Sequence, residues 1–313
     1  MFNIVSRRYI FFLISALVLV PGTFFFLTGG LLPSIDFQGG ALYDVAFADG
    51  SKVTESGLRD VYAKEGYEEI NVVTATDNVT STAHFQIRSK DVPPAKKEAL
   101  ATAMKARFGP FTELRFESVG PSVSSLVTRN AAIAVIMASI GILLYLTLVF
   151  RTVPHPVRYG VCAIIAMLHD VGVVLGVAAI MGRFFHWEVD SLFLTALLTV
   201  IGFSVHDTIV VFDRIRENSG RMRGQAYEHI VNHSIVQTLD RSLNTQLTAI
   251  FTLVAIISYS EGQLQRFAFW LLIGILSGTY SSIFNAAPLL VVWENREWNR
   301  WFKRGGAAAP AQV

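Results

Sequence analysis

Charged residues that could carry protons interrupt the apolar stretches of this sequence. Asp170 follows His169 and Asp207 follows His206 inside long apolar blocks, and Arg241 opens another block. A charged side chain at the centre of a bilayer costs at least about 2.5–3.5 kcal/mol on insertion scales, so such residues usually face a bundle interior and mark ion or proton paths. The chemistry these side chains offer in a membrane is the binding and release of protons.

Asp207 is the acid placed best for that role. It lies six residues before Asp213, the polar end of its block, so it sits about 9 Å deep at 1.5 Å per helical residue. Polar or small residues recur at helical spacing along one face of this block: Thr195, Thr199, Gly202, His206 and Asp213. Asp207 is turned about 100° from that stripe. We predict a proton-titrating carboxylate, with a structural ion pair as the alternative.

Arg241 begins a second polar stripe, which continues through Thr245, Thr248 and Thr252 with Asn244 beside it. A row of hydroxyls suits a hydrated path between helices, but Thr is also common where membrane helices pack. Arg241 is at a depth that would let it approach Asp207 from a neighbouring helix. Because arginine stays protonated, its approach favours the ionised carboxylate and its departure favours the protonated one.

His169 and Asp170 form an adjacent pair that could either shuttle a proton or simply satisfy each other's hydrogen bonds. Two GxxxG spacings lie close to the polar residues, Gly172 with Gly176 and Gly274 with Gly278. We expect these glycines to mark close helix packing rather than a moving element.

These residues require a set of membrane-spanning helices. Apolar residues make up 52% of the 313 residues and charged residues only 16%, against about 25% charged in soluble domains. Six blocks reach the length of about 20 residues that a span needs: Tyr9–Thr28, Ala131–Phe150, Val157–Met181, Ser191–Phe212, Ser242–Ser260 and Phe267–Trp293. The first block is long for a cleaved signal peptide and lacks a clear cleavage site, so we predict that it is a span.

The distribution of basic residues predicts the orientation. Residues 30–128 hold 10 Lys/Arg and 13 Asp/Glu, whereas the remainder holds 16 and 11. With the N-terminus in the cytoplasm, basic residues gather at the cytoplasmic flanks of the spans, as the positive-inside rule requires: Arg7, Arg8, Arg151, Arg158, Arg214, Arg216, Arg221, Arg223, Arg241, Arg296, Arg300, Lys303 and Arg304. We therefore predict that both termini are cytoplasmic and that residues 30–129 are extracytoplasmic.

The extracytoplasmic segment has the length of an ordinary domain. Strand and helix signals alternate in the order βαββαβ, which predicts a ferredoxin-like α+β fold: strands at 41–47, 70–76, 83–88 and 112–119, and helices at 53–64 and 93–108. Neither a nucleophile–base set nor metal-ligand spacing is visible, so we expect no enzyme. No basic run suggests nucleic acid, and the single cysteine, Cys162, excludes an intrachain disulfide.

The predicted protein is thus a polytopic α-helical membrane protein with six transmembrane helices and one extracytoplasmic domain. Its expected parts are residues 1–29 (cytoplasmic N-terminus and first span), 30–129 (the α+β domain), 130–293 (the other five spans) and 294–313 (a cytoplasmic tail with a disordered end).

Four segments also carry a resemblance to a known family. They are GFSVHDTIVVFDRIREN at 202–218, DFQGG at 36–40, RSLNT at 241–245 and HDV at 169–171. These segments closely resemble the signatures of the SecD/SecF family of the resistance-nodulation-division superfamily, in the expected order, and the resemblance extends to about residue 304. The family often has Asn where this chain has His206, so His206 either tunes the site or fills space.

The resemblance implies an accessory subunit of bacterial Sec protein export in the cytoplasmic (inner) membrane, driven by the proton motive force. It implies SecD as an obligate partner, further contacts with SecYEG, SecA and YajC, and secreted polypeptides as substrate. It also implies that Asp207 and Arg241 couple protons to movement of the external domains. We add His206, Asn244, Asp170 and His169 as further candidates for proton coupling. No cofactor other than the coupling proton is implied.

The joint between the spans and the external domain is expected just after the first span. Asp36, Phe37, Gly39 and Gly40 lie there, and the two glycines can adopt backbone angles closed to other residues. An ordinary linker turn is the alternative at this position.

Two other functions fit part of the pattern. A half-unit of a proton-driven small-solute exporter of the same superfamily would use the same intramembrane carboxylate, but it needs a substrate pocket. A receptor or scaffold would have no use for the cost of Asp170, Asp207 and Arg241 inside the membrane.

Overall fold

The computed structural model describes residues 3–47, 53–67, 69–76, 83–151, 153 and 155–301. The turns expected at 48–50 and 77–78, and the tail after Arg304, lie outside these residues. The chain divides into a helical unit, residues 1–32 with 134–313, and a smaller unit, residues 33–133. Each unit is described by itself.

The helical unit confirms the six predicted spans. Six helices are long and apolar enough to cross a membrane. Their bounds are α1 Arg8–Leu27, preceded by a 3-10 turn at Val5–Arg7, α5 Pro121–Val149, α6 Pro156–Phe185, α7 Ser191–Arg221, α8 Tyr227–Tyr259 and α9 Gly262–Ser281, which continues through a π-helical turn at Ser282–Ala286 into α10 Ala287–Glu294. A short α11 follows at Trp298–Trp301, and two-residue strands lie at Leu32–Pro33 (β1) and Glu188–Val189 (β6).

Several helices are longer than their apolar blocks. Helix α7 continues to Arg221 and α8 begins at Tyr227, so the polar stretch between the fourth and fifth blocks is mostly helical. Apolar patterning reports only the part of a helix that lipid surrounds, because a helix continues outside the bilayer with polar residues on its surface. Arg241 therefore lies inside α8 rather than at its start, where the sequence placed it.

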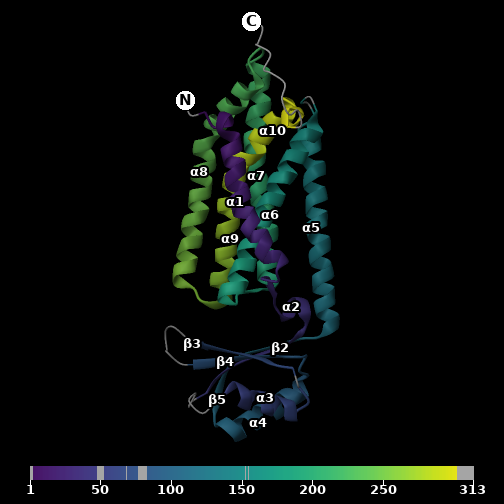
Figure 1. The fold of residues 1–313 in the computed structure, drawn as a ribbon, viewed down its shortest axis with the longest axis vertical. Helices are drawn as coiled ribbons and strands as arrows, with labels where there is room; N and C mark the ends of the chain where they lie inside the picture. Colours follow the sequence, from purple (N-terminus) through teal and green to yellow (C-terminus); the bar gives the residue numbers. More distant parts are fainter. Residues whose placement is uncertain are drawn as a thin grey trace. The chain divides into compact units, whose positions relative to one another are not determined.

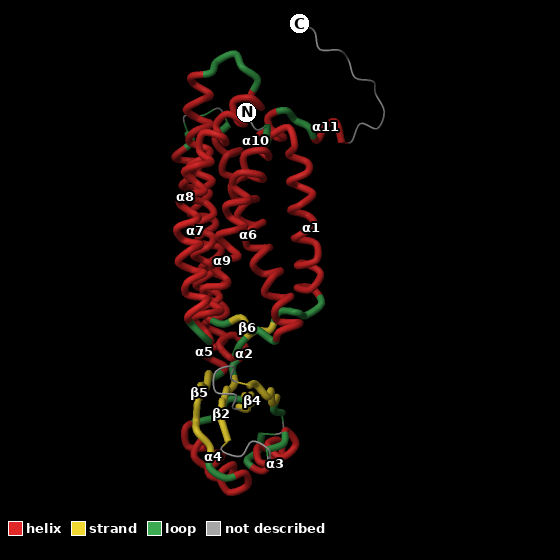
Figure 2. The backbone as a smooth tube through the Cα atoms, turned by 90° about the vertical axis from the view of Figure 1, so that its left-hand side faces the viewer, coloured by secondary structure: helices red, strands yellow, loops and turns green. Residues whose placement is uncertain are grey.

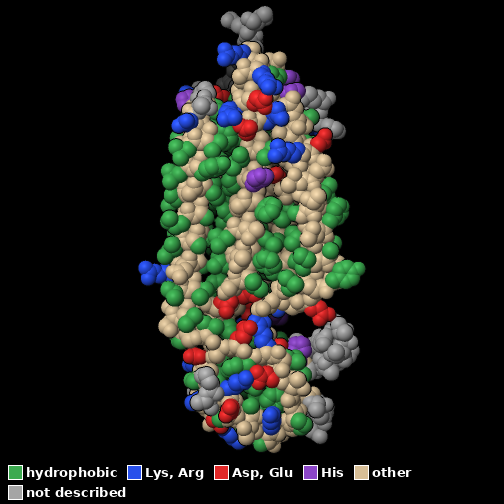
Figure 3. Space-filling model, turned by 180° about the vertical axis from the view of Figure 1, so that it is seen from behind, with side chains coloured by type: hydrophobic (Ala, Val, Ile, Leu, Met, Phe, Trp, Pro, Cys, Tyr) green, Lys and Arg blue, Asp and Glu red, His purple; other side chains and the backbone are tan. Residues whose placement is uncertain are grey.

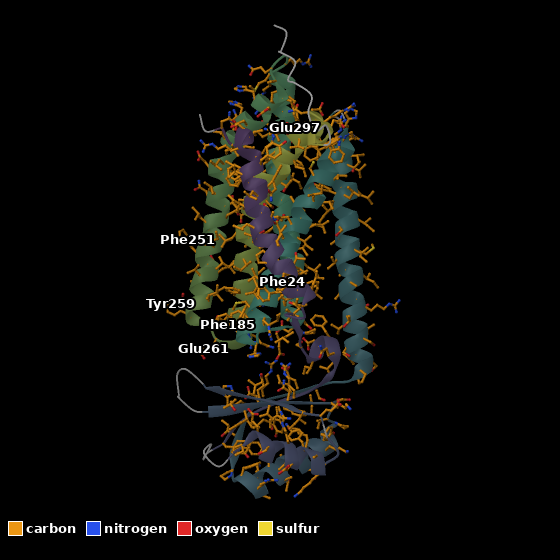
Figure 4. The ribbon with its side chains drawn as sticks, viewed as in Figure 1. Phe24, Phe185, Phe251, Tyr259, Glu261 and Glu297 are labelled. Carbon is orange, nitrogen blue, oxygen red and sulfur yellow. The ribbon has the colours of Figure 1, made fainter. Side chains whose placement is uncertain are left out.

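Helices α1, α6, α7, α8 and α9 run side by side, as Figures 1 and 2 both show. Hydrophobic side chains cover the flanks of these helices, and charged side chains gather at the end of the bundle near the two termini (Figure 3). Helix α5 is the least packed of the six, because only 6% of its membrane-length window is buried. On α8, Phe251 and Tyr259 lie on the outer surface (Figure 4). The bundle thus leaves large apolar faces open to lipid or to partner helices.

Glycines allow the closest helix contacts, as the GxxxG spacings predicted. A Cβ added at Gly176 of α6 would lie 2.7 Å from the Cα of Gly22 on α1. A Cβ at Gly274 of α9 would lie 2.0 Å from a methyl carbon of Val200 on α7, and one at Gly278 would lie 3.3 Å from the Cα of Ser204. Side chains larger than hydrogen would push these helices apart, so both GxxxG pairs serve packing.

The smaller unit contains a four-stranded antiparallel sheet and confirms the predicted βαββαβ order. Its elements are β2 Gly40–Phe47, α3 Glu55–Lys64, β3 Asn71–Thr76, β4 Ala83–Ser89, α4 Pro94–Phe108 and β5 Phe111–Val119, with a short α2 at Ile35–Gln38 before them. The sheet order is β3-β4-β2-β5, so the first strand lies between the third and fourth. This is the arrangement of the ferredoxin-like fold.

Alternation along the strands builds the core of this unit. Tyr43, Val45 and Phe47 of β2 and Phe85 and Ile87 of β4 point to the same face of the sheet. Helices α3 and α4 cover that face (Figure 1), and their buried residues include Leu58, Val61, Leu100 and Met104. The period-2 pattern of the strands and the period-3.6 pattern of the helices meet in one apolar cluster.

Arg8, Tyr9, Glu228 and Glu297 form a hydrogen-bonded cluster, here called the clamp, at the end of the helical unit near the two termini. Glu297, labelled in Figure 4, accepts hydrogen bonds from Arg8 Nη2 at 2.6 Å, Arg8 Nε at 3.2 Å and the Tyr9 hydroxyl at 2.5 Å. Arg8 Nη1 also lies 3.0 Å from Glu228 at the start of α8. Burial alone would raise the pKa of Glu297, but the hydrogen bonds from Arg8, Tyr9 and Asn295 outweigh it and hold that pKa below its ordinary value.

We expect Glu297→Gln to destabilise the helical unit by about 1.5–3 kcal/mol, because it removes the charge-assisted hydrogen bonds to Arg8, which still pairs with Glu228. A carboxylate with a lowered pKa stabilises the fold above its unfolded pKa of about 4.3, and that stability is lost as the pH falls through the folded pKa. In detergent, the thermal unfolding temperature of the variant should therefore lie below that of the parent at pH 7, and the two temperatures should become equal at strongly acidic pH. Glu294→Gln is the control, since Glu294 pairs with Arg158 but its side chain is 48% exposed. Equal stability of the two variants at pH 7 would refute the clamp.

Candidate functional site

Asp207 is buried in the interior of the helical unit, as predicted. It is 2% exposed, and its Oδ2 accepts a hydrogen bond from Gln246 Nε2 of α8 at 2.9 Å. Helix α7 places it one residue past the exposed His206 and three past the buried Ser204. In the described part of the chain, no salt bridge joins Asp207 to any basic residue. The structural ion pair considered as an alternative is therefore absent from this arrangement.

Arg241 and Asn244 lie on the exposed surface of α8, five and two residues before Gln246. Thr245, Thr248 and Thr252 are exposed as well, and each hydroxyl donates to a backbone carbonyl of α8 at 2.7–3.0 Å. The predicted polar stripe is therefore present on the surface of α8, but its threonine hydroxyls donate to carbonyls of the same helix. We group this stripe with the exposed Gly202 and His206 of α7 under the name polar face, defined as Gly202, His206, Arg241, Asn244, Thr245, Thr248 and Thr252.

Asp170 is the most enclosed acid of the helical unit and lies on a different side of α7. It is 0% exposed. Three serine hydroxyls donate to its carboxylate: Ser204 of α7 at 2.5 Å, and Ser277 and Ser281 of α9 at 2.6 Å each. His169 Nδ1 lies 3.0 Å from its Oδ1. These four partners satisfy both carboxyl oxygens, and the three serines tie α6 to α7 and α9.

Ser204 links the surroundings of the two acids. Its hydroxyl binds Asp170, and its carbonyl accepts from Thr208, which follows Asp207 on α7. The Thr208 hydroxyl also lies 3.0 Å from that of Ser282, where α9 passes into its π-helical turn. Such turns often accompany functional sites because they add a residue to the helix and turn the following side chains. Helix α7 thus carries Asp170's partner on one side and Asp207 on another.

The predicted joint forms a compact element of the smaller unit. Ser34 caps α2 by accepting the N–H of Asp36 at 3.2 Å, and Thr128 of α5 donates to the Phe37 carbonyl at 3.2 Å. Gly39 and Gly40 both have positive φ, +76° and +116°. A Cβ at Gly40 would lie 2.6 Å from the Ser89 carbonyl oxygen. The two glycines are therefore required by the backbone path into β2.

Sequence reasoning missed the side chains that surround the two acids. Gln246 was not selected, although it is buried and makes the hydrogen bond to Asp207. Ser204, Ser277 and Ser281 were not selected either. The available signal was helical spacing: Gln246 follows Ser242 by four residues, and Ser281 follows Ser277 by four, each pair on one face.

Comparison with known proteins shows the family of the chain. The profile of the family described as "Protein export membrane protein SecD/SecF, C-terminal" matches residues 99–296. The chain is 48% identical to the protein translocase subunit SecF of Thermobaculum terrenum, over 99% of this chain and 100% of that protein. The chain belongs to the SecD/SecF family. It is therefore a protein translocase subunit of the SecF type, an accessory component of Sec protein export in the membrane.

Two longer relatives combine this region with a further one. The protein translocase subunit SecDF of Bacillus subtilis is 33% identical over 93% of this chain and 38% of its own length. The crystal structure of SecDF from Thermus thermophilus superposes with a TM-score of 0.78 at 31% identity, covering 94% of this chain and 39% of that chain. The chain thus spans about two fifths of these fused relatives, which indicates association with SecD.

Proposed function

We propose that the chain couples proton flow through the membrane to movement of its extracytoplasmic domain, and that this movement promotes the export of secreted polypeptides. Asp207 is the residue that binds and releases the proton, and Arg241 is its mobile counter-charge. Both termini are cytoplasmic, and residues 30–129 lie on the opposite side of the inner membrane. SecD is the obligate partner, and SecYEG, SecA and YajC are the other components that the subunit contacts.

One observation carries the proposal: Asp207 is buried, with a neutral amide as its hydrogen-bond donor and with no salt bridge to a basic residue among the described residues. A buried carboxylate needs a paired cation or a bound proton. Gln246 suits either state, because its Nε2 can donate to the carboxylate and its Oε1, which has no partner in the described residues, can accept from the protonated acid. The arrangement therefore tolerates a change of protonation at one position.

Arg241 supports the same cycle from the polar face. It lies on α8 about one turn before Gln246 and is exposed in the isolated chain. Approach of its guanidinium would supply the missing counter-charge when the proton leaves. Alternation between a paired, ionised Asp207 and an unpaired, protonated Asp207 would shift α8 against α7. The joint at Asp36, Phe37, Gly39 and Gly40 would pass this shift to the external domain.

SecD explains the polar face of the helical unit. Polar groups of membrane helices usually face other helices or water rather than lipid, and the fused relatives contain a further region. We expect Gly202→Trp to prevent co-purification with SecD, because a Cβ at Gly202 meets nothing within 4 Å inside the chain. Gly141→Trp on α5 is the matched control, since its Cβ is equally free. Retained SecD binding in Gly202→Trp, or export restored by the chain without any SecD-like partner, would contradict this assignment.

The test of the proposed function is export in membrane vesicles that contain the chain and SecD, with and without an imposed proton gradient. We expect the gradient to stimulate export only when the chain is present. The half-unit of a small-solute exporter, the alternative, predicts gradient-driven movement of a solute instead. Assays of solute transport in the same vesicles distinguish the two functions.

A further inference from the structure

A cavity of about 250 Å³ lies between α1, α6 and α9, away from the polar face. Six aliphatic side chains supply most of its wall: Ile14, Val18, Val173, Val177, Ile273 and Leu276. Ile14, Val18 and Leu276 are also exposed on the outer surface of the bundle, so the cavity borders the region that lipid occupies. Its accessible wall is almost wholly apolar, and an apolar cavity of this size stays dry.

Four polar residues also line this cavity, and the hydroxyl groups of three of them already donate hydrogen bonds within the protein. Ser277 donates to Asp170, Tyr280 donates to the Phe11 carbonyl at 2.7 Å, and Ser15 exchanges hydrogen bonds with Asn285. The fourth is His169, whose side chain is only 9% exposed. Its Nε2 is buried and has no hydrogen-bond partner in the described residues.

The contact with Asp170 uses the other ring nitrogen of His169. Nδ1 lies 3.0 Å from Asp170 Oδ1, so Nε2 is the ring nitrogen that remains for a ligand, as a donor or an acceptor according to the tautomer. A buried polar atom without a partner is destabilising, and a ligand hydroxyl, which can donate or accept, recovers this loss.

We propose that this cavity binds a small apolar molecule that carries one hydroxyl, of the alkylphenol or alkyl alcohol class. The aliphatic wall accepts the apolar body, and the hydroxyl forms a hydrogen bond with His169 Nε2 after a rotamer change of the aliphatic side chains that cover it. The ligand enters from the bilayer. An acyl chain of a lipid is the competing occupant, and it has no hydroxyl for Nε2.

The experiment compares 4-propylphenol with propylbenzene, which has the same apolar body without the hydroxyl. Binding to the full chain in detergent is measured by the shift in thermal unfolding, at equal mole fractions of each probe in the micelles. One hydrogen bond to a buried ring nitrogen predicts an affinity about fivefold higher for the phenol. His169→Phe should abolish this preference while leaving propylbenzene binding unchanged.

Leu276→Trp serves as a second variant if His169→Phe does not fold. It fills the cavity from its rim and should abolish binding of both probes, whereas Leu264→Trp, at an exposed position on the same helix outside the cavity wall, should bind both. Equal affinity of the phenol and propylbenzene in the parent chain would overturn the proposal and leave an acyl-chain crevice. Binding unaffected by Leu276→Trp would overturn it as well. Neither outcome depends on proton coupling at Asp207.

Discussion

Asp207→Asn is expected to abolish the stimulation of export by a proton gradient without lowering the abundance of the protein. Asparagine preserves the size of the side chain and can still hydrogen-bond Gln246, which lies 2.9 Å from the carboxylate in the parent. It does not titrate in this pH range, so the charged and neutral states can no longer alternate. Gradient-dependent export in vesicles should fall to the level of vesicles that lack the chain.

Related variants separate the proton-binding role from a packing role. Arg241→Met should give the same loss, because the counter-charge is removed while the exposed surface of α8 keeps a side chain of similar length. Asp207→Glu should retain part of the stimulation, since a titrating carboxyl group remains one methylene further out. Full stimulation in Asp207→Asn at matched protein levels would make Asp207 structural, and Asp170 would become the next candidate.

Gly40→Val has the second large expected effect, at the joint of the smaller unit. The φ of +116° is strained for a residue with a side chain, at about 1–3 kcal/mol. The added Cβ would also lie 2.6 Å from the Ser89 carbonyl, inside contact distance. We expect the protein to insert normally but to lose export activity, because the start of β2 must move. Export at normalised protein levels measures this loss.

Two controls assign the effect to the joint. Gly66→Val carries similar backbone strain at φ +89°, but its Cβ meets nothing within 4 Å. Gly120→Val has neither problem, since its nearest neighbour is an Asp91 oxygen at 3.6 Å. Both variants should export more than Gly40→Val does. Parental export activity in Gly40→Val would show that residues 36–40 are an ordinary linker turn.

The main features of the fold followed from patterns of neighbouring residues. Apolar blocks located the six spans, and the change from period-2 to period-3.6 spacing located the elements of the α+β unit. The ends of α7 and α8 could not be found in this way, because residues such as Arg221 and Tyr227 continue a helix outside lipid without any apolar signal. The clamp of Glu297 with Arg8 joins residues 289 positions apart, a pairing that no local pattern contains.

The same reasoning predicted the acids of the candidate site but not the side chains that bind them. The cost of charge in an apolar block was enough to select Asp170 and Asp207. Which neutral side chains would satisfy them depended on tertiary packing: Gln246 reaches Asp207 from α8, and Ser281 reaches Asp170 from α9. A serine or glutamine in a membrane helix costs less free energy than a charged residue, so its position alone does not indicate a site. The residues around both acids could therefore be identified only from the structure.

Proton uptake by the reconstituted protein tests the central proposal most directly. The chain and SecD are placed in liposomes that enclose a pH-sensitive dye, and an inward proton gradient is imposed. The account predicts acidification of the interior with the parent chain and no acidification above protein-free liposomes with Asp207→Asn, while SecD still co-purifies with the variant. Equal acidification by parent and Asp207→Asn would contradict the assignment of Asp207 as the proton-coupling residue.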